Sequence, residues 1–201
     1  MQRSIRNLTR GLAGICIAAG VFAASSASAA EPYLLDQNAA APIVGALMEP
    51  IAPFTGGKSG STTSILQFGD SNHASSDVAG NGSLSVIQQS GINNRASQHI
   101  DGNNSALLLV QGGSNNSVFQ AAKGDNDFQL VGVSGRDNKV AYIQNGDNLA
   151  GALDVRNAQN ATVVAIQTPQ SGNYLMPTGL NGIKNATVVV VPGRMYVFPK
   201  R

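Results

Sequence analysis

The 201-residue sequence has one cysteine, no tryptophan and few charged side chains. Its cysteine, Cys16, lies in a segment that we expect to be removed, so no disulfide can cross-link the mature chain. Only 11 acidic residues and 2 histidines are present, which limits the groups available for acid–base chemistry. No segment beyond Ala30 is long and apolar enough to span a membrane. The order of this chain must therefore come from backbone pairing and side-chain stacking.

The segment 1–30 has the pattern of a secretory signal peptide. Arginines precede an apolar run over residues 11–24, and small residues at 27–30 offer a cleavage site. Cys16 would fit a lipoprotein signal, but lipid attachment requires a small residue before the cysteine and Ile15 stands there. We therefore expect an exported protein that is not inserted in a membrane.

Removal of this segment changes the charge balance of the chain. It contains Arg3, Arg6 and Arg10, which are three of the 13 basic residues, and none of the 11 acidic ones, so the net charge falls from +2 to −1. The basic pI of the whole sequence then gives no argument for nucleic-acid binding, and we expect no nucleic-acid partner.

Beyond Gly60, asparagine recurs with a 22-residue period, and other residues keep step with it. A fixed period of this length is typical of a repeat architecture. The asparagines are Asn72, Asn94, Asn116, Asn138 and Asn160. Glycines lie three residues before the first four, at Gly69, Gly91, Gly113 and Gly135. The first three repeats also have Gln67, Gln89 and Gln111, preceded by Ser61, Ser83 and Ser105.

Each repeat has two halves, and each half ends in a turn rich in glycine and asparagine. These residues tolerate left-handed backbone angles, so two such turns predict two corners per repeat. The segments between the corners have the length and composition of strands. The pattern therefore predicts a strand–turn–strand–turn coil that stacks on the next. Five coils begin at Ser61, Ser83, Ser105, Asp127 and Leu149, and a degraded half-coil follows.

Alternation along each strand separates an interior set of side chains from an exterior set. In the second coil the interior set is Ser83, Ser85, Ile87, Gln89, Asn94, Ala96, Gln98 and Ile100, and the other coils follow the same positions. An apolar stripe lies on the exterior, at Leu84, Val86, Leu108, Val110, Phe128 and Leu130. We expect this stripe to be covered, either by the apolar segment 33–54 or, as we favour, by a neighbouring filament.

The interior asparagines, glutamines and serines are expected to form ladders along the stack. Parallel strands in register lie about 4.8 Å apart, so each amide can donate a hydrogen bond to the identical amide of the next coil. Hydrogen bonding of this kind is the condition for burying polar side chains. The expected ladder comprises the serines, the glutamines and all five asparagines of the period, and the four glycines are expected to form the turns.

The 22-residue pattern also sets the boundaries of the chain. We expect a signal peptide over 1–30, a flexible segment rich in proline and alanine over 31–60, the repeats over 61–191 and a basic tail over 192–201. The fourth and fifth coils are less regular than the first three. Val155 and Asn157 stand at the glutamine and glycine places of the fifth coil, and an insertion with two prolines follows it.

The spacing Ser, five residues, Gln-x-Gly, two residues, Asn-x-Ala resembles the curlin repeat of bacterial curli amyloid subunits. The first two repeats match five anchors of that pattern and the third matches four, over roughly half of the chain. The matched residues are Ser61, Gln67, Gly69, Asn72 and Ala74, then Ser83, Gln89, Gly91, Asn94 and Ala96, then Ser105, Gln111, Gly113 and Asn116. The second glutamine of the repeat is present only at Gln144.

This resemblance implies an all-β fold, a two-sheet parallel β-solenoid of about five 22-residue coils plus the degraded terminal half-coil. It also implies a subunit of an extracellular amyloid fibre, either the major subunit or a nucleator. We expect this subunit to self-assemble by end-to-end stacking, with coil one accepting the last coil of another molecule. The implied partners are further copies of the chain, other curli-type subunits, and export and chaperone factors. The implied location is the surface of a Gram-negative-type bacterium, reached through the periplasm.

Other sites have weaker support in the sequence. His73 and His99 occupy different positions of the polar face, so we expect solvated side chains rather than a metal site. Asp125 and Asp147 share one corner position in consecutive coils, where a calcium ion could bridge them, although like charges on a wet corner are the ordinary interpretation. We expect no metal and no cofactor.

Two other functional classes compete with the fibre. Parallel β-helix enzymes need paired carboxylates in a groove, whereas the acids of this chain fall mainly in the corners, so we expect no enzyme and no catalytic residues. The alternative function is a secreted β-solenoid module for adhesion or carbohydrate binding. That function requires exposed aromatic platforms, and the outer strand faces offer only Phe119 and Phe128.

Overall fold

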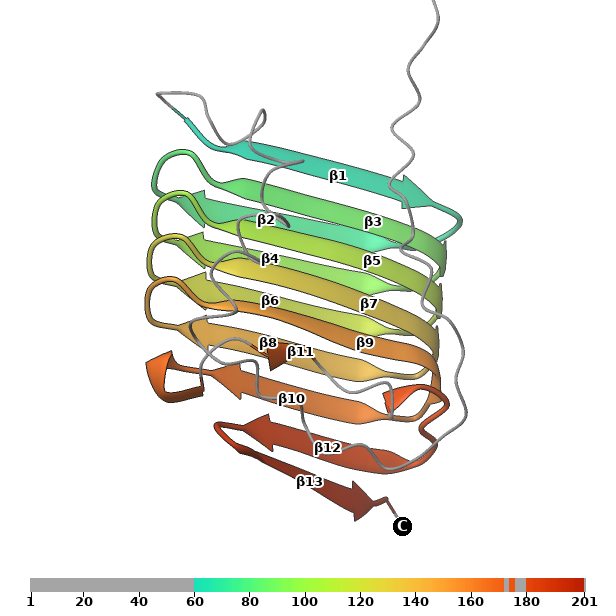
Figure 1. The fold of residues 1–201 in the computed structure, drawn as a ribbon. Coiled ribbons are helices and arrows are strands. Elements are labelled where there is room, and N and C mark those ends of the chain that lie inside the picture. Colours follow the sequence, from blue (N-terminus) through green and yellow to red (C-terminus); the bar gives the residue numbers. More distant parts are fainter. Residues whose placement is uncertain (1–59, 172–173, 176–179, 201) are drawn as a thin grey trace, which may run out of the picture.

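The computed structural model shows a flattened stack of β-coils (Figure 1). The described residues are 60–171, 174–175 and 180–200; the expected signal peptide and residues 31–59 lie outside them. Each of the first four coils has two strands. The first strands of these coils are β1 (Thr62–Phe68), β3 (Leu84–Ile92), β5 (Ala106–Ser114) and β7 (Phe128–Arg136). Their second strands are β2 (His73–Ala79), β4 (Arg95–Asp101), β6 (Ser117–Lys123) and β8 (Lys139–Asn145). Coil five has β9 (Ala150–Gln159) and β10 (Thr162–Gln167). A short 3₁₀ helix (Pro169–Ser171) and β11 (Tyr174–Leu175), β12 (Ala186–Val191) and β13 (Arg194–Pro199) complete the chain.

First strands and second strands form separate sheets. One sheet has the order β1-β3-β5-β7-β9-β11, and the other has the order β13-β12-β10-β8-β6-β4-β2. Neighbouring strands are parallel throughout, except that β13 is antiparallel to β12. The expectation of a two-sheet parallel β-solenoid is therefore confirmed.

The expected register is confirmed for the first four coils. Residues 22 apart pair across each interface, as Thr62 pairs with Leu84 and His73 with Arg95. All eight interior residues expected in the second coil are buried. Buried positions alternate with accessible ones along β4, β6 and β8, which is the pattern of a strand with one face in the core.

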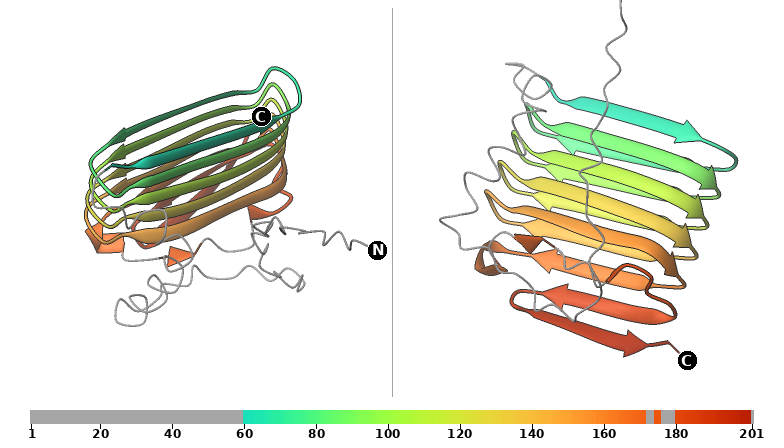
Figure 2. Two further views of the ribbon diagram at one scale, coloured as in Figure 1. Left: turned by 90° about the horizontal axis from the view of Figure 1, so that it is seen from above. Right: turned by 45° about the vertical axis from the view of Figure 1, so that its right-hand side comes forward.

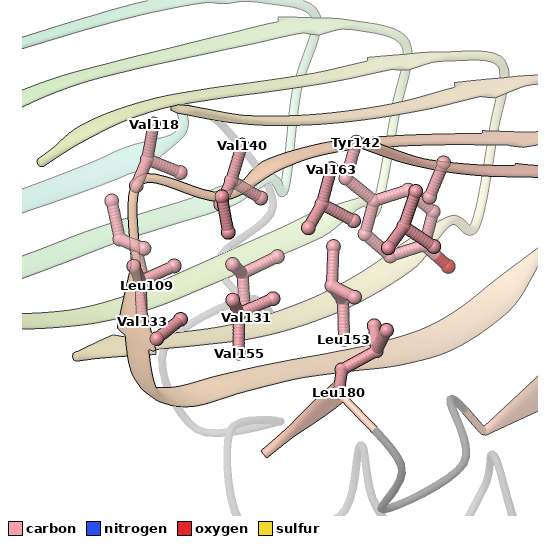
Figure 3. Close-up of a cluster of buried hydrophobic side chains, with 14 of the residues drawn as sticks. Leu109, Val118, Val131, Val133, Val140, Tyr142, Leu153, Val155, Val163 and Leu180 are labelled. Carbon is pink, nitrogen blue, oxygen red and sulfur yellow. The ribbon is translucent and has the colours of Figure 1, made fainter. Parts of the chain in front are cut away.

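The core lies between the two sheets and is thin and mainly aliphatic. Figure 3 shows Leu109, Val131 and Leu153 of the first sheet facing residues of the second, with Val155 beside them and Leu180 below Leu153. These side chains are at most 1% exposed. Leu109, Val131 and Leu153 form one column through successive coils in one register, so each coil buries the side chains of its neighbours.

The outer apolar stripe is covered only in part. Leu84 and Phe128 are buried, where they pack with the outward-facing alanines of the same column, and Leu108 packs against this cluster. Val110 and Leu130 are instead 48% and 37% exposed. Segment 33–54 lies outside the described residues, so the two expected covers stay predictions.

The four expected turn glycines occupy the first corner and have positive φ angles of 95–114°. Successive coils approach so closely there that an added side chain has no room. A Cβ on Gly69, Gly91 or Gly113 would lie 2.0–2.1 Å from the carbonyl oxygen of the glycine in the next coil. This position therefore requires glycine both for its backbone angle and for the spacing of the stack.

We predict that Gly113→Ala lowers the free energy of unfolding by about 3 kcal/mol or more, since strain and backbone overlap act together. Gly193→Ala is the matched control, because Gly193 also has a positive φ (69°) but has nothing within 4 Å of an added Cβ. We expect the control substitution to lower the free energy of unfolding by about 1 kcal/mol. Denaturant unfolding followed by circular dichroism measures both, and equal losses would contradict the packing argument.

Candidate functional site

The serine column connects backbone and side chain of consecutive coils. It contains Ser61, Ser83 and Ser105, with Asp127 in the fourth coil. Each side-chain oxygen accepts the backbone N–H of the equivalent residue one coil later, at distances of 2.9–3.1 Å, ending at Leu149. Each serine hydroxyl also donates to the carbonyl oxygen of a glycine in the second corner, at 3.0–3.2 Å. A serine at this place therefore bridges a strand start and a corner.

The asparagine column connects consecutive coils at the first corner, through hydrogen bonds between side chains and backbone. It contains Asn72, Asn94, Asn116 and Asn138, and its last three members are buried. Each Oδ1 accepts the backbone N–H of the equivalent residue one coil later, at 3.0–3.1 Å. Each Nδ2 donates to the carbonyl oxygen at the turn-glycine position one coil later, at 2.9–3.0 Å. One amide thus satisfies a backbone donor of the next coil and also donates to a backbone carbonyl oxygen there.

The glutamine column is shorter than the asparagine column. Gln67 donates from Nε2 to Oε1 of Gln89 at 2.6 Å, and Gln89 donates in the same way to Gln111 at 2.8 Å. The next places are occupied by Val133 and Val155, which join the apolar core. Gln111 therefore turns its Nε2 to the carbonyl oxygen of Arg95, at 3.2 Å.

Asn160 does not belong to the asparagine column, contrary to the expectation from the 22-residue period. Coil five contains one extra residue, which appears as a bulge: Val133 pairs with Val155 but Gly135 pairs with Ala158. Ala161 consequently takes the place below Asn138, whose Oδ1 accepts the Ala161 N–H at 3.0 Å.

Asn160 instead lies on the exposed corner with a φ angle of 50° and donates to Oδ1 of Asn185 at 2.9 Å. Its place is equivalent to that of Asp137, the corner residue before Asn138. The bulge also corrects the expected place of Asn157, because Ala158 and not Asn157 is paired with Gly135.

Two further amide pairs were not expected as ladders. Gln98 donates to Gln120 at 2.8 Å, and Gln144 donates to Gln167 at 2.8 Å. The alternation of side chains along the strand predicted that Gln98 lies in the interior. Gln167 was missed because it lies one position outside the 22-residue phase of Gln144, and a one-residue shift in coil five would have identified it.

Asp127 is the chemically unusual member of the serine column. The residue is buried, its Oδ1 accepts the Leu149 N–H, and its Oδ2 has no hydrogen-bond partner among the described residues. Burial, with smaller contributions from the charges of Asp147 and Asp125, raises the pKa of Asp127 from 3.8 to about 7, although the Leu149 N–H opposes the shift. A serine in this place would carry no such charge.

The two corner acids considered for calcium are engaged in the corner itself. Asp125 accepts the backbone N–H of Asn103 at 2.7 Å, and Asp147 accepts that of Asp125 at 2.9 Å. Within the described part of the chain, no group of three or more histidine, cysteine, aspartate or glutamate side chains could hold a metal ion. The corner acids therefore act in the structure as acceptors for backbone N–H groups.

The two histidines lie on the exposed face of the second sheet, as expected from the sequence. His73 is paired with Arg95, and His99 is paired with Asp77, with 3.1 Å between Nδ1 and the carboxylate. Both members of the His99–Asp77 pair are well exposed, so this contact contributes little to stability.

No protein-family model, curated protein or solved structure matches this chain. None of the described helical segments is long and apolar enough to cross a bilayer. The interpretation of function therefore depends on the columns and on the repeat pattern.

We predict that Asn94→Ala lowers the free energy of unfolding by about 2–4 kcal/mol, because it leaves the buried Asn116 N–H without its acceptor and removes the hydrogen bond to the Gly113 carbonyl oxygen. Asn185→Ala should cost less than about 1 kcal/mol, since Asn185 is exposed and its side chain bonds only that of Asn160 among the described residues. Thermal unfolding of both variants measures the difference. Equal losses would count against the column as the organising contact.

We predict that the stability of the solenoid falls as the pH rises from about 4 to about 7. In this window folded Asp127 retains a proton that the unfolded chain releases, because its pKa is about 7 when folded and 3.8 in its ordinary state. The expected loss is about 2 kcal/mol, since water at the adjoining corner screens part of the effect.

Asp127→Ser should remove this decline while its hydroxyl still accepts the Leu149 N–H. Asp137→Asn, at an exposed corner of the same coil, should leave the decline in place. Unfolding midpoints at several pH values measure it, and an unchanged pH profile in Asp127→Ser would overturn the assignment to Asp127.

Proposed function

We propose that this chain is a structural subunit of an extracellular, curli-like amyloid fibre that contributes to a biofilm matrix and to adhesion. The observation that carries the proposal is the first coil, whose column groups and strand edges have no neighbour among the described residues on the side away from coil two. Edges of this kind template the addition of further strands. The repeat pattern, which resembles the curlin repeat, supports the same function.

The open side is a complete recognition surface rather than a single unpaired strand. Both β1 and β2 are edge strands of their sheets, and both belong to the same coil. A coil added there would extend two sheets, the apolar core and the columns at once. Parallel in-register stacking of this kind is the arrangement of cross-β fibres.

The partners under this proposal are curli-type subunits with the same repeat. Export and chaperone factors would carry the chain through the periplasm to the cell surface. No cofactor, metal or nucleic acid is needed for assembly, because backbone groups, amides and hydroxyls supply every contact between coils described above.

An adhesive or carbohydrate-binding module is the second candidate, and one observation favours it. Tyr196 and Phe198 on β13 are 41% and 53% exposed, and their rings stack with centroids 6.4 Å apart. Exposed aromatic rings are suited to the apolar faces of sugars. This pair lies at the end of the stack opposite coil one (Figure 1).

We predict that the mature chain, incubated with a curli-type subunit at micromolar concentration, enters thioflavin-binding fibres that give the two cross-β diffraction spacings, of strands and of sheets. Absence of the chain from fibres over several days, both alone and with that subunit, would overturn the proposal. Glycan binding that is lost in Tyr196→Ala with Phe198→Ala would then favour the second candidate.

A further inference from the structure

The two ends of the solenoid are different, as the views in Figure 2 show. At the N-terminal end the interior of coil one is uncovered. Ile65 occupies the same core column as Ile87 and Leu109, yet Ile65 is 42% exposed whereas the other two are fully buried. Every residue of β1 is exposed. Within the described part of the chain, coil one therefore lacks the neighbour that each later coil has on its N-terminal side.

The hydrogen-bonding groups of this open face define what would fit it. Between later coils, serine and asparagine oxygens of one coil accept backbone N–H groups of the next. The backbone N–H groups of Ser61 and Asn72 have no such acceptor among the described residues, nor does Oε1 of Gln67 have a donor. An added coil must therefore supply a serine oxygen to accept the Ser61 N–H and an asparagine oxygen to accept the Asn72 N–H. It must also supply a glutamine Nε2 that donates to Oε1 of Gln67.

Sterics add two glycines to these requirements. A Cβ on Gly91 would lie 2.0 Å from the carbonyl oxygen of Gly113 in the next coil. A Cβ on Gly80, at the second corner, would lie 2.2 Å from the carbonyl oxygen of Gly102. The coil that stacks on coil one must therefore have glycine at both corners. Counted from its first serine, the required pattern is glutamine at the seventh residue, glycine at the ninth, asparagine at the twelfth and glycine at the twentieth.

The preceding residues of this chain cannot supply that coil. In the same 22-residue phase, Gly45 stands at the glutamine place and Pro50 at the asparagine place. Leu47 and Lys58 stand at the two glycine places, where any side chain would overlap the backbone of coil one. The sequence upstream of Gly60 is thus incompatible with an in-register coil.

The C-terminal end of a second copy cannot supply it either. β13 pairs with β12 along its whole length, so the edge that a parallel strand would need is occupied. Ala186 stands below Ala161 and hence at the asparagine place, with no side-chain oxygen. Lys200 fixes the hairpin by donating from Nζ to the carbonyl oxygen of Asn160 at 2.8 Å.

The first sheet and the core are also closed at this end. β11 contributes only two paired residues below β9, and the chain crosses beneath Arg156 and Gln159 with irregular hydrogen bonds. Leu180 fills the end of the core and is 1% exposed. A copy of coil one would find only the two-residue edge of β11 in the first sheet, an antiparallel edge strand in the second sheet and a closed core.

We propose that coil one is a one-sided docking face for the C-terminal side of an in-phase curlin-like coil from a different chain, and that the β12–β13 hairpin ends the stack. The chain would then occupy one end of a fibre instead of repeating along it. This inference deepens the proposed function and rests on it for the identity of the partner, whereas the polarity of the stack rests on the two ends described above.

A synthetic peptide of residues 83–104 is a direct probe, because it has Ser83, Gln89, Gly91, Asn94 and Gly102 at the five required places. Fluorescence anisotropy of the labelled peptide with the whole mature chain should show saturable binding. The control peptide with Gly91→Leu, which copies the leucine found upstream, should bind at least tenfold more weakly. Equal binding of the two peptides would overturn the proposed docking geometry.

Two lysine variants of the mature chain test which end binds. Ile65→Lys places a charge on the open core of coil one and should weaken peptide binding at least tenfold. Val197→Lys is the control, since Val197 is 56% exposed on β13, and it should bind the peptide as the unaltered chain does. Circular dichroism verifies that both variants are folded. Loss of binding in Val197→Lys alone would assign docking to the hairpin and overturn the proposal.

Sedimentation of the chain without peptide tests whether a second copy is the occupant. Monomers are expected, and dimers or long fibres that disappear in Ile65→Lys would overturn the proposal in favour of self-association. Peptide binding without entry into curli-type fibres would leave the docking face valid and the proposed function wrong. Entry into those fibres by Ile65→Lys as efficiently as by the unaltered chain would leave the function valid and overturn the docking face.

Discussion

The hydrogen bond from a backbone N–H to the side-chain oxygen of the equivalent residue one coil earlier is the interaction on which this structure depends. It occurs at the start of both strands at each of the four interfaces between coils one to five, through serine or aspartate at one corner and asparagine at the other. A short polar side chain at these places satisfies a donor that the strand ladder cannot reach. The stack therefore keeps one register, because a slip of one residue would bury unpaired groups at both corners.

Glycine sets the distance at which these bonds can form. At the first corner the backbones of successive coils approach so closely that a methyl group would overlap a carbonyl oxygen. The amide columns and the glycine corners therefore require each other, and this explains why they recur together in the sequence. Coil five, where Ala158 replaces the glycine and an extra residue forms a bulge, also marks the end of the asparagine column.

Much of the fold could be predicted from the sequence, because residues at equivalent places of a stack contact each other directly. The period predicted the coils, and alternation predicted the interior sets of both strands. Asn160 was misassigned because two adjacent polar residues precede the second strand in each of the first four coils, so one extra residue in coil five brought the first corner residue, Asn160, into the 22-residue phase of the second. Gln167 was missed for the same reason. The antiparallel pairing of β13 on β12, within the segment expected as a basic tail, depends on tertiary contacts that no periodicity expresses.

The coils are regular at the N-terminal end of the solenoid and irregular at the C-terminal end, so the two ends differ in structure. Polar columns that can template another coil face one end, and valines, Leu180 and an antiparallel strand close the other. Under the proposed function, this arrangement would direct assembly to the N-terminal end of the stack. An edge strand that ends in proline and pairs in the opposite direction is itself a barrier to further parallel addition.

Amide hydrogen exchange of the monomeric mature chain tests the central interaction most directly. The account predicts strong protection for the backbone N–H groups of Asn94, Asn116 and Ala161, each of which bonds an asparagine oxygen one coil earlier. It predicts fast exchange for the N–H of Asn72, which has no such acceptor among the described residues. Equal exchange at Asn72 and Asn116, or fast exchange along the whole column, would contradict the account.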